Sequence, residues 1–207
     1  HLPCYSSNAS FNIKYIADPV IDLRNEIARK YGIHEQFDSH LDLLLKDDLD
    51  AVVVTLPRKL TFGVIHDLCN SGLNVITEKP LCLNYKNAKK LLEVQRIKQN
   101  ILMTGYMKQH DKGVKQFTQE INAISREEII SIRAYCHMGN SYASPFGDKK
   151  GEFIPALDNN SVEAMPDWLP EDLHWSYEQF INVFSHITQL LEHIFGNQLQ
   201  LSSQLVN

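Results

Sequence analysis

The chain has 207 residues, a formal net charge of −5, 43% hydrophobic residues and 22% charged residues. This composition is ordinary for a globular protein, and the length allows one large domain or two small ones. The acidic balance gives no basic surface for nucleic acid, and no apolar run approaches the ~20 residues that span a bilayer. We therefore expect neither nucleic acid nor a membrane as a partner, and the lack of a signal-peptide pattern favours a cytoplasmic location.

Four cysteines are scattered along the sequence without a C-x-x-C pair: Cys4, Cys69, Cys82 and Cys136. This usage favours reduced thiols over a disulfide framework or a zinc site, and we expect no metal site. Cys69 and Cys82 are expected to be small apolar fillers rather than nucleophiles.

Strand-like and helix-like segments alternate along the first 104 residues. Hydrophobic spacing predicts strands at 13–17, 51–56, 73–77 and 101–104, and helices at 21–31, 39–46, 61–71 and from 84 or 85 onward. The run 51–56 is apolar at successive positions, which is typical of a parallel strand buried on both faces. The order predicts an α/β fold over residues 1–106, a Rossmann-type doubly wound parallel sheet.

The pattern changes after Gly105, and residues 107–207 are expected to form a second domain. A helix is predicted at 112–124, and residues 128–137 alternate as a half-buried antiparallel strand would. Residues 139–178 are expected to be a long irregular loop, followed by a final helix at 176–195.

Glu78-Lys79-Pro80 follows the predicted strand 73–77 directly. A lysine at the carboxyl end of a buried strand points into the crevice where open α/β sheets bind ligands. A surface turn with an ordinary lysine is the alternative, but the surrounding strand–helix–strand pattern favours a ligand site. A cis peptide bond before Pro80 is possible, with a trans proline that ends the strand as the other option.

The final helix carries a polar stripe along the edge of a broad apolar arc. Asn182, His186, Gln189 and His193 form it, at spacings of 4, 3 and 4. Amides and imidazoles without Lys or Glu suit a cleft that binds hydroxyl groups. A single helical histidine is more often structural than catalytic. However, with an ordinary pKa near ~6.5, His186 can take a proton at neutral pH, which makes it a candidate base.

A dinucleotide-binding sheet normally opens with a strand and a glycine-rich turn, and this chain has nine glycines but no G-x-G-x-x-G. Strand 13–17 ends at Asp18, where the acidic residue that binds the adenosine ribose belongs, roughly 20 residues after the glycine motif. This spacing places the motif upstream of His1, so we expect a fragment that lacks the first strand and phosphate loop. Asp18 favours NAD over NADP because a carboxylate repels the 2′-phosphate, although Asp18-Pro19 can equally be a simple turn.

With these elements in order, the sequence resembles the glucose–fructose oxidoreductase/inositol dehydrogenase (Gfo/Idh/MocA) family. Residues 1–3 are similar to the segment after the family's glycine turn, residues 50–57 match its Thr/Ser-x-Pro strand end, and residues 72–81 match its signature segment without a gap. The resemblance implies a fold that continues past Asn207. Residues 107–207 would then be part of an α+β substrate and oligomerisation domain with an open antiparallel sheet, and the full-length protein would be a homo-oligomer.

The resemblance also implies a function: hydride transfer between NAD, with NADP possible, and a hydroxyl of a sugar, polyol or related compound. Lys79 and His186 would flank the reacting hydroxyl as donor and base, and Asn182 would help to position it. The expected cofactor contacts are Asp18, Thr55, Leu56, Pro57, Glu78 and Lys79. The expected substrate contacts are Tyr106 and Lys108, which lie near the predicted cleft, and Gln189 of the polar stripe.

Three positions depart from the family pattern. Thr61 stands where a histidine is common, Gln109 where an arginine is common, and Asn182 where the family usually has the aspartate of Asp-x-x-x-His. The uncharged Asn182 weakens the case for proton transfer more than the case for binding. Two alternatives therefore remain open: a non-catalytic relative that senses a nucleotide or sugar, and an inactive fragment.

Overall fold

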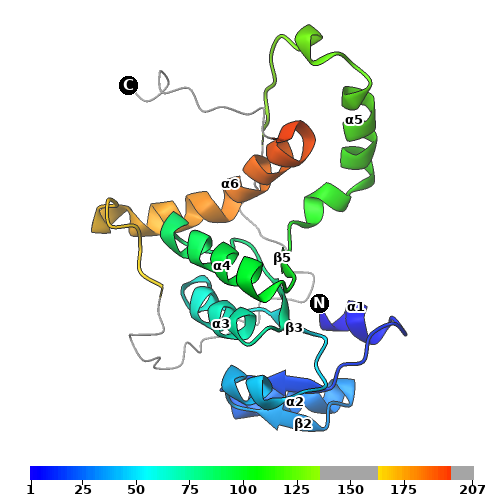
Figure 1. The fold of residues 1–207 in the computed structure, drawn as a ribbon, viewed down its shortest axis with the longest axis vertical. Helices are drawn as coiled ribbons and strands as arrows, with labels where there is room; N and C mark the ends of the chain where they lie inside the picture. Colours follow the sequence, from blue (N-terminus) through cyan, green and yellow to red (C-terminus); the bar gives the residue numbers. More distant parts are fainter. Residues whose placement is uncertain (136–162, 197–207) are drawn as a thin grey trace.

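The computed structural model describes residues 1–135 and 163–196 of the chain (Figure 1). Its first part alternates parallel strands with helices, in the α/β order that the sequence predicts. The elements are α1 (Leu2–Ser6), β1 (Tyr15–Ala17), α2 (Ile21–Tyr31), β2 (Glu35–Phe37), the 3-10 helix η1 (His40–Leu45), β3 (Ala51–Val54), α3 (Arg58–Asn70), β4 (Asn74–Thr77), α4 (Tyr85–Lys98) and β5 (Leu102–Thr104). The second part is helical where it is described, with η2 (Met107–His110), α5 (Lys112–Asn122), η3 (Arg126–Glu128), η5 (Glu171–Leu173) and α6 (His174–Phe195).

The strands form two parallel sheets rather than one continuous sheet. β1 pairs with β2, and β4 lies between β3 and β5. In the usual Rossmann strand order, 3-2-1-4-5-6, strand 1 lies between the pair 3-2 and the group 4-5-6. No residue of the described ranges 1–135 and 163–196 occupies that position, so β1 and β3 have no common neighbour there. The strands on either side follow the Rossmann arrangement.

Local signals set the helix ends. Gly32 ends α2 with a left-handed backbone (φ 67°), which costs little without a Cβ. The Asn84 side chain accepts a hydrogen bond from Asn87 N at 2.9 Å and so caps α4. Asp111 caps α5 in the same way through Gly113 N. These caps fix where the chain enters and leaves the edge of the sheet.

The core lies between the three-stranded sheet and the two helices α3 and α4, which run side by side over it (Figure 1). Its fully or almost fully buried members are Val54, Ile65, Leu68, Cys69, Val75 and Leu91. Cys69 is inaccessible, and burial raises the pKa of its thiol. Burial, helped by Glu163, likewise raises the pKa of Cys82 to about 12. Both thiols are therefore the inert fillers that the sequence predicts.

Most predicted elements are present, with small shifts at their ends. Residues 39–46, predicted as a helix, form the 3-10 helix η1, since a single short turn suits i→i+3 bonding. α3 begins at Arg58 rather than 61, directly after Pro57, which is its N-cap residue. The sequence missed β2, whose three residues are held by their pairing with β1 rather than by an apolar pattern.

The predicted strand at 128–137 is wrong over the residues that are described. Residues 126–128 form η3, and residues 129–135 have no regular structure. Ile130 is 99% exposed, so its alternation with polar neighbours does not bury a face. A strand also needs a neighbouring strand to satisfy its backbone, and the described part of the chain offers none here. Residues 136–137 lie outside the described residues, as does the 139–162 part of the predicted loop.

In the described parts of the chain, none of the helices has the length and apolar character needed to span a membrane.

Candidate functional site

The site lies at the carboxyl edge of the three-stranded sheet. Because β3, β4 and β5 are parallel, the segments that follow them meet at one edge. Glu78 N donates to Val54 O, and Gly105 N donates to Thr77 O at 2.7 Å. A Cβ at Gly105 would stand only 3.3 Å from the Thr77 carbonyl oxygen, so this close approach favours glycine. The backbone thus places Glu78 and Lys79 beside Gly105.

Helix α6 brings Asn182 to Lys79. The Lys79 ammonium donates to the side-chain Oδ1 of Asn182 at 2.7 Å and to its backbone oxygen at 2.9 Å. The peptide bond between Lys79 and Pro80 is cis. Burial is the main cause that lowers the pKa of Lys79, and Arg58 and Lys108 lower it further, whereas Glu78 opposes them. The neutral oxygens of Asn182 satisfy the ammonium without adding a countercharge.

A cavity of about 310 Å³ opens between the sheet edge and α6. Its lining residues are Glu78, Lys79, Gly105, Met107, Asn182 and His186. The structure therefore brings together the three side chains that the sequence suggests for catalysis, Lys79, Asn182 and His186. They come from two segments of the chain, the end of β4 and the middle of α6, and they share one space large enough for a small ligand.

His186 is a buried histidine, with 8% of its surface exposed. The edge of the Tyr106 ring meets it, with ring centroids 6.2 Å apart and planes at 86°. Its Nδ1 is buried and has no hydrogen-bond partner among the described residues. Burial lowers the pKa of His186, Lys79 and Lys108 lower it further, and Glu78 opposes them. At neutral pH the imidazole is therefore uncharged and able to accept a proton.

Glu78 joins the N-terminal segment to the site. Its Oε1 lies 2.6 Å from His1 Nε2, and its Oε2 accepts a hydrogen bond from the backbone N of Lys79. The segment that resembles the family's sequence after its glycine turn is thus placed at the same edge of the sheet. The Glu78 carboxylate is engaged on both oxygens.

The remaining expected substrate contacts surround the cavity without lining it. Tyr106 packs on His186, and burial raises the pKa of its phenol. Lys108 is half-buried in η2, next to Met107. Gln189 donates from Nε2 to Gln109 Oε1 at 3.0 Å. His193, the last residue of the predicted stripe, is exposed. The stripe therefore faces the site along its first turns only.

The expected cofactor contacts follow two different strands. Asp18 follows β1, and its Oδ1 accepts a hydrogen bond from Val20 N at 2.8 Å. This hydrogen bond closes a turn at Asp18-Pro19, the alternative role considered for Asp18 above. Residues 55–57 follow β3; Leu56 packs against the core and Pro57 precedes α3. In dinucleotide-binding folds, an acidic residue at the carboxyl end of a parallel strand is the group that holds the adenosine ribose. Residues 55–57 stand at the carboxyl end of β3. No G-x-G-x-x-G occurs in residues 1–207 to hold the pyrophosphate.

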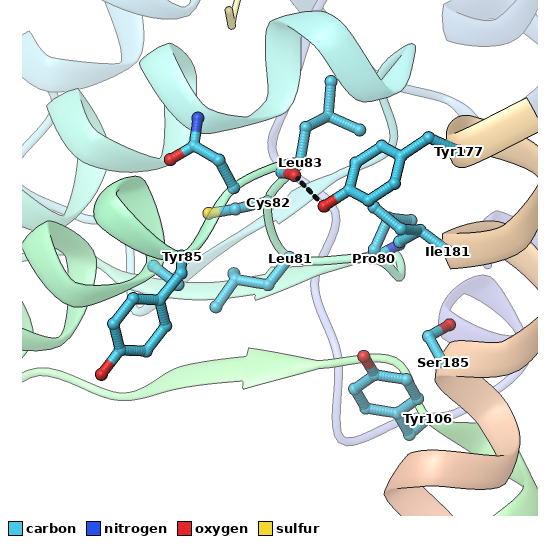
Figure 2. Close-up of a pocket in the computed structure, with 11 residues that line it drawn as sticks. Pro80, Leu81, Cys82, Leu83, Tyr85, Tyr106, Tyr177, Ile181 and Ser185 are labelled. Carbon is cyan, nitrogen blue, oxygen red and sulfur yellow. Dashed lines mark hydrogen bonds between the residues drawn. The ribbon is translucent and has the colours of Figure 1, made fainter. Parts of the chain in front are cut away.

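The sequence missed a second cavity, of about 270 Å³, which Tyr106 helps to line. Figure 2 shows Tyr177 and Ile181 of α6 facing the loop that runs from Pro80 to Leu83, with Ser185 beside Tyr106. The Tyr177 hydroxyl donates to the Leu83 carbonyl at 3.0 Å. A spacing of four residues along α6 was the available signal for this face.

Glu163 is a second feature that the sequence missed. It is 4% exposed, and its Oε1 accepts hydrogen bonds from Leu83 N, Asn84 N and Asn87 Nδ2. Burial raises the pKa of Glu163, and these hydrogen bonds partly offset the rise. The residue thereby anchors the segment before α6 to the start of α4. It lies in an irregular stretch without a pattern that would single it out.

Three comparisons identify the family. Residues 1–106 match the oxidoreductase family with an NAD-binding Rossmann fold, Gfo/Idh/MocA. The chain is 28% identical over 147 residues to the dTDP-3,4-didehydro-2,6-dideoxy-alpha-D-glucose 3-reductase of Actinomadura kijaniata, covering 71% of this chain and 43% of that protein. It is 24% identical over 108 residues to the scyllo-inositol 2-dehydrogenase (NAD⁺) of Bacillus subtilis, covering 52% of this chain and 32% of that protein.

Solved structures agree with this match. A structure of KijD10, a 3-ketoreductase from Actinomadura kijaniata, in complex with NADP and TDP-benzene superposes with a TM-score of 0.55 at 28% identity. The superposition covers 59% of this chain and 37% of that one. A probable dehydrogenase from Thermotoga maritima, with a TM-score of 0.57 and 21% identity, shares the fold. This chain thus spans less than half the length of each of these relatives, and it belongs to the Gfo/Idh/MocA family of oxidoreductases with an NAD-binding Rossmann fold.

Proposed function

We propose that the protein is an NAD(P)-dependent oxidoreductase that acts on a hydroxyl or carbonyl group of a sugar, polyol or related compound. The observation that carries this proposal is the convergence of Lys79, Asn182 and His186 on one cavity. The family match and the names of the relatives, a sugar reductase and an inositol dehydrogenase, support the reaction class. A location in the cytoplasm, a homo-oligomeric assembly and a division into domains near residue 106 remain parts of the same proposal.

The cofactor in this proposal is NAD or NADP, whose nicotinamide ring supplies or takes up the hydride. Asp18 would hold the adenosine ribose, and residues 55–57 with Glu78 and Lys79 would border the nicotinamide end. The Asp18 carboxylate favours NAD through repulsion of a 2′-phosphate. The KijD10 structure contains NADP, so both cofactors belong in the test.

In this proposal, Lys79, His186 and Asn182 have different roles at the reacting oxygen. Two N–H groups of Lys79 are engaged by Asn182, which leaves the third to donate to a substrate oxygen and stabilise negative charge there. His186 takes the hydroxyl proton during oxidation and returns it during reduction. Because its Nδ1 is enclosed by protein, the exchange takes place at Nε2. Asn182 orients the ammonium.

A non-catalytic, ligand-sensing relative is the second candidate. The observation that favours it is the Nδ1 of His186, which lacks a partner among residues 1–135 and 163–196. Histidines that act as bases are commonly oriented by a hydrogen bond at the second ring nitrogen. A sensor transfers no proton, so the missing hydrogen bond at Nδ1 would not impair it.

The deciding experiment uses the full-length protein. NADH and NADPH are titrated by fluorescence, and sugars and polyols are then screened for turnover. Lys79→Met and His186→Asn are each expected to lower kcat by about 10² to 10⁴, with little change in cofactor affinity for His186→Asn. Lys112→Gln, an exposed site on α5, leaves kcat unchanged. Cofactor binding without turnover of any compound would contradict the enzyme and favour the sensor.

A further inference from the structure

Leu83 is held at both of its backbone polar groups by side chains from later parts of the chain. Its N donates to Glu163 Oε1 at 3.0 Å, and its carbonyl accepts a hydrogen bond from the Tyr177 hydroxyl at 3.0 Å. Its own side chain is buried, with 1% of the residue exposed. Because close packing holds the side chain and hydrogen bonds hold the backbone, the Leu83 carbonyl is a fixed point on the loop that follows Lys79.

Tyr177 is well placed to use this fixed point. It lies near the start of α6, and its ring meets the ring of Trp168 at 89°, with centroids 5.8 Å apart. Burial raises the pKa of the Tyr177 phenol, and the charge of Glu163 raises it further. The hydroxyl therefore stays protonated near neutral pH and remains a donor. Tyr177 is not among the described residues that line the cavity at Lys79.

Helix α6 thus contacts the same loop at two points. Tyr177 holds Leu83, and Asn182 holds the Lys79 ammonium. Five residues separate Tyr177 from Asn182, a rise of about 7.5 Å along the helix axis. His186 follows one turn later and lines the same cavity as Lys79. Two contacts at different heights fix how far α6 lies along the loop, and this placement sets where Asn182 and His186 stand relative to Lys79.

The ion pairs of Glu178 do not replace the Tyr177 contact. Glu178 lies 3.4 Å from Arg58 and 3.2 Å from Lys59, both at the start of α3. Lys59 is exposed and Arg58 is partly exposed. Long, solvated side chains of this kind attract α6 without holding it in one geometry. The hydrogen bond to the fixed Leu83 carbonyl is the more precise constraint.

We infer that Tyr177 is a positioning residue for the proposed reaction: its hydroxyl holds α6 in register with the loop 79–83, so that Asn182 and His186 meet Lys79 at the reacting oxygen. The inference rests on the proposed function for the chemistry, whereas the placement of α6 on Lys79 is independent of turnover. Tyr177 acts through Asn182 and His186 rather than on the substrate. A misplacement of about 1 Å at a catalytic group lowers a rate by up to about 10²-fold.

The kinetic test uses Tyr177→Phe in the full-length protein. This variant keeps the ring beside Trp168 and removes the hydroxyl, so kcat should fall about tenfold or more, while KM and NADH affinity change less than about threefold. Tyr85→Phe is the matched control. It removes a hydroxyl from a 75% exposed tyrosine that lines the same second cavity, and it should leave kcat unchanged.

A double-mutant cycle with Asn182→Ala separates positioning from a general structural role. Because both contacts are needed for the register of α6, removal of the Tyr177 hydroxyl should cost less than about threefold in kcat once Asn182 has released Lys79. A loss of general stability would lower kcat by the same factor in both backgrounds. Melting temperatures of all variants confirm that they are folded.

Chemical labelling of Lys79 tests the placement of α6 without any turnover. Limiting acetic anhydride is added at fixed pH, and mass spectrometry measures acetylation of Lys79 relative to the exposed Lys112. Release of the ammonium from Asn182 should raise this ratio about threefold or more in Tyr177→Phe. Asn182→Ala gives the ratio for a fully released lysine, and Tyr85→Phe should match the unmodified protein.

An unchanged labelling ratio in Tyr177→Phe overturns the inference, as does an equal loss of kcat with and without Asn182→Ala. If the unmodified protein turns over a sugar or polyol and Tyr177→Phe retains its kcat, the positioning role fails and the oxidoreductase stands. If Tyr177→Phe exposes Lys79 but no compound exchanges hydride with NAD(P), the placement of α6 by Tyr177 stands and the oxidoreductase fails.

Discussion

The ammonium of Lys79 is held by the side-chain and backbone oxygens of Asn182, a residue 103 positions later in the chain. This contact connects the end of β4 to the middle of α6, and it encloses the cavity from two sides. It also gives Asn182 a structural partner, where the sequence suggested a substrate hydroxyl. In the proposed catalysis, the Lys79 ammonium and the Asn182 amide therefore act as one unit.

Asn182→Asp tests that unit directly. A carboxylate at 2.7 Å from the ammonium would favour the charged forms of Lys79 and His186, so both pKa values should rise, by roughly one unit or more for Lys79. For oxidation of an alcohol, the neutral His186 is the active form, and the acidic limb of the kcat/KM profile should move to higher pH. An unchanged limb would contradict the assignment of His186 as the base. Asn182→Ala serves as the control without charge, with lowered kcat and no upward shift.

Tyr106 is expected to hold the His186 ring in place through its edge contact. Tyr106→Phe keeps the ring and should retain kcat within about threefold, whereas Tyr106→Ala removes the contact and should lower kcat about tenfold or more. KM should change less than kcat in the alanine variant, because the defect lies in the orientation of a catalytic group. Equal losses in both variants would instead point to the phenol hydroxyl, which lies near Ser185.

The arrangement at the sheet edge could be predicted because it follows from local patterns. Apolar runs marked β3 and β4, and parallel strands place Glu78 and Lys79 at the ligand edge whatever lies around them. The meeting of Lys79 with α6 was suggested by the resemblance, whereas the hydrogen bonds to Asn182 depend on how α6 docks. Helical spacing shows which side chains share a face but not which oxygen each of them meets.

The elements that the sequence analysis missed or assigned wrongly have the opposite cause, because their structure depends on contacts with other parts of the chain. β2 exists because β1 pairs with it, and its residues carry no apolar alternation. Ile130 lies in an alternating segment that forms no strand among the described residues, because alternation without a pairing neighbour does not define one. Glu163 is recognisable only after the chain has folded back onto α4.

Glu163 makes the stability of this docking pH-dependent. Burial raises its pKa above the ordinary value of 4.5, so the folded state favours the neutral acid. Its contribution to stability is fully present below that ordinary value and is lost as pH rises through the raised pKa. Compared with Glu163→Gln, which is neutral at every pH, the unmodified protein should become progressively less stable in urea denaturation across the pH range that starts at the ordinary value of 4.5 and extends through the raised pKa. A constant difference across this range would contradict a buried, titrating carboxyl group.

Glu163→Ala tests the hydrogen bonds rather than the charge. It leaves Leu83 N, Asn84 N and Asn87 Nδ2 without their common acceptor. The free energy of unfolding should fall by about 1 to 3 kcal/mol, measured at a pH below 4.5 where the acid is neutral. A matched control is Asp167→Ala, which removes the fully exposed partner of Lys86 nearby and should have little effect.

Asp18 decides between the cofactors if it faces the adenosine ribose. Asp18→Asn retains the oxygen that accepts from Val20 N but removes the negative charge, so the turn should persist while the repulsion of a 2′-phosphate disappears. The ratio of NADPH to NADH affinity should rise about tenfold. Asp22→Asn, on the exposed first turn of α2, changes the net charge equally and should leave the ratio unaltered. If both variants shift the ratio by the same factor, the effect comes from net charge, and Asp18 is only the residue that closes the turn.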